Sequence, residues 1–157
     1  MAEVKVKNTH RSFGATVPYG NTTTLAYELK TGATGAALNS DSTTALAIGD
    51  VVDLGPLPKG MRLDDALVVV TTGMTATITG SLGFKYEDGT DSTEVPQDAA
   101  YFGAVLDLAT AGRVRSTGSK LVKLPKPARL ILTTAVAANA KASDIKVLVT
   151  GELIGAL

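Results

Sequence analysis

The chain has 157 residues, of which 45% are hydrophobic and 4% aromatic, and its 15 Lys and Arg balance its 15 Asp and Glu. This length fits one domain, and the zero net charge gives no overall signal for binding to nucleic acid or to a membrane surface. The chain has no Cys and one His, His10, so a disulfide framework is excluded and most nucleophilic and metal chemistry lacks its usual side chains. We therefore expect a protein that acts through its surface, not an enzyme, with no cofactor and no metal.

Residues 1–42 are rich in small polar side chains, and their apolar residues are isolated. The alternation in Thr22–Lys30 predicts one strand, and the small, polar stretch Thr31–Ser42 predicts a flexible linker or an exposed loop. Phe13 and Tyr19 are costly to leave in water, so they are candidate anchors on another chain. We predict an extended N-terminal arm over residues 1–42, with a partly disordered terminus as the alternative.

Short apolar runs recur between turn residues over residues 43–157. The segment Ala99–Ala109 suits either a strand or a short helix. Four other segments carry clear strand patterns: Ala66–Val70, Ala76–Tyr86, Arg129–Val136 and Ile145–Ile154. We count about eight strands at near-regular spacing, which predicts an all-β domain built as a β-sandwich or a barrel.

Charges of opposite sign are separated along the chain. One stretch holds six acids and no base: Glu87, Asp88, Asp91, Glu94, Asp98 and Asp107. The next holds six bases and no acid: Arg113, Arg115, Lys120, Lys123, Lys126 and Arg129. Either adjacent strands neutralise each other within one domain, or the patches meet on neighbouring copies or on a larger lattice. Exposed pairs within one subunit contribute only about 0–1 kcal/mol each, so we take the six bases as candidate interface residues. Nucleic acid is a weaker partner, because no aromatic residues for stacking lie among the bases.

Several carboxylates are close in sequence. The acidic loop Glu87–Glu94 could bind Ca²⁺, although its spacing is not that of an EF-hand, and a solvated hairpin turn is the alternative. The pairs Asp50/Asp53 and Asp64/Asp65 would suit glycoside hydrolysis only if their carboxylates converged. Because the chain also has few aromatic residues for stacking sugars, a carbohydrate-active enzyme ranks last among the candidate functions.

The order of several segments resembles that of small structural proteins of tailed bacteriophages, in particular capsid decoration or cement proteins. The resemblance covers about residues 45–157 and includes no catalytic motif. The segments that carry it are Ile48–Gly60, Leu67–Val70, Asp88-Gly89, Tyr101-Phe102-Gly103, Ala111-Gly112-Arg113 and Ile145–Glu152.

The resemblance implies an antiparallel, jelly-roll-like β-sandwich on the outer surface of a virion. Such proteins are made in the host bacterial cytoplasm. They bind the lattice of a separate major capsid protein and form dimers or trimers over joints between capsomers. The resemblance thus implies a homo-oligomer that stabilises the capsid and contacts neither nucleic acid nor a membrane directly. The alternative function is a receptor-binding β module associated with a tail or a fibre.

Overall fold

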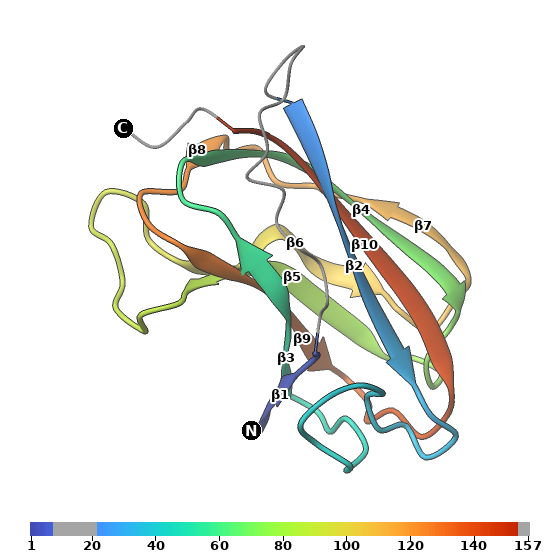
Figure 1. Ribbon diagram of the computed structural model, residues 1–157. Helices are drawn as coiled ribbons and strands as arrows, with labels where there is room; N and C mark the ends of the chain where they lie inside the picture. Colours follow the sequence, from blue (N-terminus) through green and yellow to red (C-terminus); the bar gives the residue numbers. More distant parts are fainter. Residues whose placement is uncertain (8–21, 154–157) are drawn as a thin grey trace.

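The computed structural model describes residues 1–7 and 22–153, which form two packed β-sheets (Figure 1). No helix occurs within these ranges, and therefore none that could cross a membrane. The described strands are β1 (Glu3–Lys5), β2 (Thr22–Thr31), β3 (Val51–Leu57), β4 (Met61–Thr72), β5 (Thr79–Tyr86), β6 (Asp98–Asp107), β7 (Gly112–Arg115), β8 (Val122–Lys123), β9 (Ala128–Ala135) and β10 (Ser143–Leu153).

The first sheet has the strand order β1-β3-β9-β5-β6, and the second has the order β2-β10-β4-β7, with β8 also pairing with β4. All of these described pairs are antiparallel except β1 with β3. The predicted all-β, antiparallel, jelly-roll-like sandwich is confirmed. The ambiguous segment Ala99–Ala109 belongs mainly to strand β6, so the strand interpretation is the correct one. The described strands number ten, against about eight predicted, because β1 and β7 have only three and four residues, too few to show a pattern in sequence.

The core lies between the sheets and follows the two-residue period of their strands. On β4 and β10 the inward positions carry β-branched residues, and Val68 lies opposite Val147 in the register. The aromatic residues of β5 and β6 gather in the same core, where Phe84 and Tyr101 meet edge to face with centroids 5.5 Å apart. Burial of these apolar surfaces is the main force that holds the sheets together.

The described parts of residues 1–42 belong to the sandwich, which contradicts the predicted boundary at residue 42. Strand β2 pairs with β10 along its whole length and buries Leu29 completely. Strand β1 pairs with β3 and buries Val4. Both strands add apolar side chains to the common core, so they are strands of this domain and not an arm outside it. Residues 8–21 of the predicted arm lie outside the described residues.

The segment Thr31–Ser42, predicted as a flexible linker or an exposed loop, is a partly exposed loop held against the sandwich by Asn139. This side chain is 1% exposed and donates from Nδ2 to Thr31 Oγ1 and to the Lys141 carbonyl, at 3.0 and 2.9 Å. Gly35, at a φ of 84°, lies against the Asn139 backbone so closely that a Cβ would fall 2.1 Å from its carbonyl oxygen. Small residues were therefore needed for close packing, not for flexibility.

Candidate interaction surface

Strand β7 places two of the predicted interface cations along one edge of the second sheet. Arg113 lies opposite Val69 and Arg115 opposite Leu67 of β4. Arg115 donates to Asp65 with 2.7 Å between Nη2 and Oδ2, but its side chain is 78% exposed. Arg113 is exposed and makes no ion pair with any described residue.

Strand β8 and the loop before it carry the next two cations, Lys120 and Lys123. Lys123 lies opposite Arg62 of β4, so it follows the same sheet edge as β7. Within the described ranges neither lysine forms an ion pair, and the side chain between them, Leu121, is 65% exposed. This part of the edge therefore presents unpaired positive charge together with an apolar side chain.

Tyr101 holds this loop against the sandwich. Its hydroxyl oxygen lies 2.7 Å from the Lys120 carbonyl and 3.0 Å from the Leu63 carbonyl, and it accepts from the Val122 N–H at 3.2 Å. Gly118 approaches the Tyr101 carbonyl so closely that a Cβ would lie 2.4 Å from it. Burial raises the pKa of Tyr101, so its hydroxyl stays protonated at neutral pH. These contacts fix the backbone that carries Lys120.

The outer face of the second sheet combines these cations with half-buried apolar residues. Leu148 of β10 lies opposite Leu67 of β4 and opposite Ala26 of β2. Leu67, Leu148 and Val69 are neither fully buried nor fully exposed, and Ala26 is exposed. An apolar centre bordered by charged residues is the arrangement found in protein–protein interfaces.

Lys126 is engaged within the chain. Its ammonium donates to both carboxylate oxygens of Asp88, at 3.0 and 2.8 Å, and lies 4.6 Å from the centre of the Tyr86 ring. The hydrogen bond from Lys126 lowers the pKa of Asp88, and a second one from the Thr90 backbone acts in the same direction. This cation fastens the acidic loop to β5 and is not available in the way that the sequence predicted.

Arg129 is also engaged within the chain. Its Nε donates to both oxygens of Asp53, at 3.0 and 2.9 Å, and the Asp53 side chain is 4% exposed. Neutralisation within one domain, the first of the two alternatives for the basic stretch, therefore applies to part of it. Arg115, Lys126 and Arg129 pair with acids far away in sequence, and only the last of these acids is buried.

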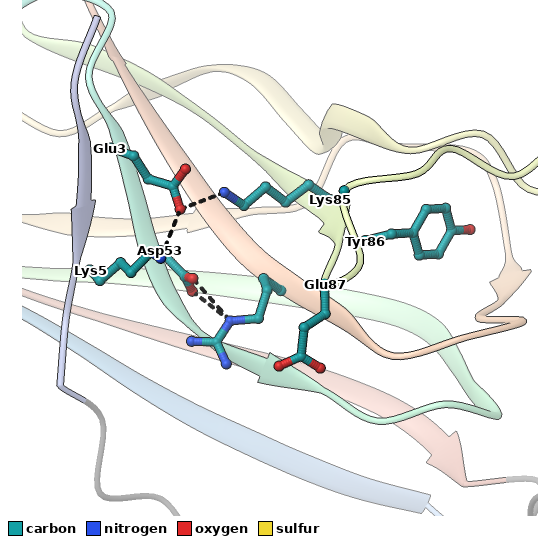
Figure 2. Close-up of a pocket in the computed structure, with 8 residues that line it drawn as sticks. Glu3, Lys5, Asp53, Lys85, Tyr86 and Glu87 are labelled. Atoms are coloured by element: carbon teal, nitrogen blue, oxygen red, sulfur yellow. Dashed lines mark hydrogen bonds and ion pairs between the residues drawn. The ribbon is translucent and has the colours of Figure 1, made fainter.

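The Arg129–Asp53 pair lines an open pocket of about 480 Å³ on the outer face of the first sheet (Figure 2). In the same pocket the Lys85 ammonium lies 2.6 Å from a Glu3 carboxylate oxygen. The charged residues that line it are Glu3, Asp53 and Glu87 against Lys5, Lys85 and Arg129. The lining therefore carries three acidic and three basic side chains and no net formal charge.

The acidic loop Glu87–Glu94 is organised by its own backbone. Asp91 Oδ1 accepts from the N–H groups of Ser92 and Gln97, both at 2.7 Å. Tyr86 donates its hydroxyl to the Val95 carbonyl, which ties the far end of the loop to β5. Within the described residues, no three His, Cys, Asp or Glu side chains gather as they would around a metal ion.

Two of the predicted interface residues, Phe13 and Tyr19, lie outside the described residues, as does His10. The members of each carboxylate pair bind different partners in the described part of the chain, and in the second pair Asp64 binds Arg62 whereas Asp65 binds Arg115. Asp50 accepts from the backbone N–H groups of Ala2 and Ala47, at 2.9 and 2.8 Å, whereas Asp53 binds Arg129. These contacts give both carboxylates structural roles.

Two solved structures share this fold, although no family model and no curated protein matches the chain. A chain of the structure described as "Capsid of Ralstonia phage GP4" has a TM-score of 0.69 and 19% identity, over 99% of this chain and 100% of that one. A chain of "Cyanophage Pam1 capsid asymmetric unit" has a TM-score of 0.58 and 16% identity, over 92% and 94% of the two chains. At these identities the comparison shows a common fold.

The outer face of the second sheet and the partners of the basic residues are not predictable from the sequence pattern alone. The alternation of β10 does separate Leu148 from its inward neighbours Val147 and Val149, which was the available signal. The strand pairing that brings Leu148 beside Leu67 has no local signature, because the two residues are far apart in the chain.

Proposed function

We propose that this chain is a structural protein of a phage virion that decorates and stabilises the capsid. In this proposal it binds the lattice of a major capsid protein on the outer surface of the head and also contacts its own copies. The observation that carries the proposal is the fold shared with a chain of the Ralstonia phage GP4 capsid structure, over 99% of one chain and 100% of the other.

The outer face of the second sheet is the surface that we assign to the capsid lattice. Its centre, formed by Leu67, Val69 and Leu148, is apolar enough to gain from being covered. Arg113 and Lys120 lie along its border, and the described residues supply no acid to pair with them. An acidic border on the lattice would therefore fix the orientation of the bound chain.

The two N-terminal anchors stay part of the proposal. Phe13 and Tyr19 are aromatic residues in a polar segment, and aromatic side chains supply much of the energy of protein–protein contacts. We assign them to the contact with the lattice or with a neighbouring copy.

Stabilisation would follow from mass action. A protein that binds across joints of the assembled lattice, but not to separated subunits, lowers the free energy of the assembled state. The free-energy gain grows with the concentration of free protein relative to its dissociation constant, and no catalytic step is needed.

The test is to mix the purified chain with heads that lack it and to sediment the particles. We expect the chain to sediment with the heads up to a fixed number of copies and to raise the temperature at which they release DNA. Binding to tails or fibres but not to heads would instead support the receptor-binding alternative. Binding to neither would contradict the proposal.

A further inference from the structure

Strand β2 is a long sheet edge that no described residue covers between Thr22 and Leu29. Unpaired edge strands invite pairing with another chain, and proteins usually block them with short strands, bulges or covering loops. Asp41 covers the edge of β1. Its carboxylate accepts from the Lys5 N–H, and its backbone N–H donates to the Lys5 carbonyl. Strand β7 has only four residues, and the pairing of β6 with β5 contains two register shifts. Strand β2 has ten residues with neither a Gly nor a Pro.

The backbone of β2 shows which of its residues face outward. The Lys30 carbonyl accepts from the Leu38 N–H on the side away from β10, and the Gly32 N–H donates to the Ala36 carbonyl on the same side. Since backbone groups alternate sides along a strand, the even-numbered residues point away from β10. The folded-back loop occupies this edge only near Lys30. The outward residues whose backbone N–H and carbonyl are both left unbound by the described residues are Thr22, Thr24, Ala26 and Glu28.

We propose that β2 pairs with β2 of a second copy, antiparallel about a two-fold axis, to join two second sheets into one. A two-fold pairing that uses all four free positions must place Thr22 opposite Glu28 and Thr24 opposite Ala26. Leu25 then faces the same residue of the other copy at the axis. The dimer itself is argued from the β2 edge alone. Only its role on a capsid rests on the proposed function.

The side chains suit this register. Glu28 meets a neutral Thr22, so no like charges lie opposite each other. Leu25 is half-buried at the edge of the core, and pairing with its own copy would cover its remaining apolar surface. Ala26 and Thr24 are small and leave room for close approach of the two backbones. The described edge therefore complements itself, as a two-fold interface requires.

A cysteine scan tests the register directly, because the chain has no Cys of its own. Residues facing each other at a non-hydrogen-bonded antiparallel position have Cα atoms about 4.5 Å apart, within the range for a disulfide. Under mild oxidation, Leu25→Cys in the full chain is expected to form a covalent dimer. The matched control Thr23→Cys is not, since its two copies would be about 14 Å apart along the strands. Absence of cross-linking in L25C, or equal cross-linking of both variants, would overturn the proposal.

A second pair of variants tests the backbone hydrogen bonds without cysteine chemistry. Ala26→Pro removes an outward N–H and leaves the pairing with β10 intact, whereas Ala26→Val keeps the N–H. In analytical ultracentrifugation we expect A26P to weaken the dimer at least about tenfold, with A26V close to wild type. A wild-type chain that is monomeric at high micromolar concentration would contradict the proposal. No capsid is present in either experiment, so a failure here is separate from a failure to bind heads.

Discussion

The basic stretch contains two groups of cations that sequence cannot separate but the fold does. Lys126 and Arg129 point back onto the domain and bind Asp88 and Asp53. Arg113, Lys120 and Lys123 follow a sheet edge and pair with no acid in the described chain. A run of like charge is therefore not by itself a surface patch, because the partners of each cation are decided by strand pairing. The first group should matter for folding and the second for binding.

The largest effect on stability is expected from Arg129→Met. This change leaves the Asp53 carboxylate buried without its cation, and loss of one partner of a buried pair costs about 3 kcal/mol. Arg115→Met is the matched control, since its pair with Asp65 is exposed and contributes less than about 1 kcal/mol. Urea unfolding of both variants measures the difference. Equal losses would mean that burial of Asp53 does not set the Arg129 pair apart from the exposed Arg115 pair.

An intermediate effect on stability is expected from Tyr101→Phe. This change tests whether the Tyr101 hydroxyl holds the loop that carries Lys120 in place. Loss of the hydroxyl removes the contacts with Leu63 and Lys120 and should lower the free energy of unfolding by about 1–2 kcal/mol. Because these contacts fix the backbone of Lys120, binding to heads should weaken as well. Tyr27→Phe, which removes a hydrogen bond to the Pro56 carbonyl, is the control. It should cost similar stability and leave binding unchanged; equal loss of binding would argue against positioning of Lys120.

The alternation of apolar residues predicted most of the buried strands correctly, but it did not predict the packed loop Thr31–Ser42. Ala66–Val70 and Ile145–Val149 are predictable because β-branched residues alternate or run together where strands are buried. The small polar residues of Thr31–Ser42 predict a flexible linker or an exposed loop, because such residues serve flexible linkers as well as tightly packed turns. The residue that decides between them, Asn139, is more than a hundred positions away from Thr31.

The sequence showed which charged residues could form the candidate surface, but not how they are arranged in space. The six bases are visible in the sequence, but which of them are paired within the chain depends on three acids. These acids, Asp53, Asp65 and Asp88, lie 76, 50 and 38 residues from their partners. Such separations leave no local signal. The prediction that the chain acts through its surface did not specify which sheet face carries the apolar residues.

A smaller, pH-dependent effect is expected from Asp88→Asn, which breaks the contact of Lys126 with the acidic loop. The pKa of Asp88 is lowered in the folded chain, so the ionised form is favoured by folding. Its contribution is present above the usual aspartate pKa of about 3.9 and is lost as the pH falls through the lowered pKa. Thermal melts should show D88N slightly less stable than wild type at neutral pH, with the difference disappearing in acid. A difference that persisted in acid would exclude the Asp88 charge as its cause.

The smallest effect on stability, and a large one on binding, is expected from the double reversal R113E/K120E. Neither residue has an ion-pair partner within residues 1–7 and 22–153, so the free energy of unfolding should change by less than about 0.5 kcal/mol. Binding to heads should fall, and added salt should weaken the wild-type contact where its charges stay exposed. The control K7E/K141E changes net charge equally at exposed sites elsewhere. If the control lost binding equally, the net charge of the chain would explain the loss, and the positions of Arg113 and Lys120 would not.

Electron microscopy of heads carrying the wild-type chain tests the central claim most directly. The account predicts copies on the outer surface of the capsid, with Arg113, Lys120 and the outer face of the second sheet against the lattice. Arg129 should remain paired with Asp53 inside each copy, away from any contact. A map in which the chain is absent from heads, or in which the outer face of the second sheet points to solvent, would contradict the account.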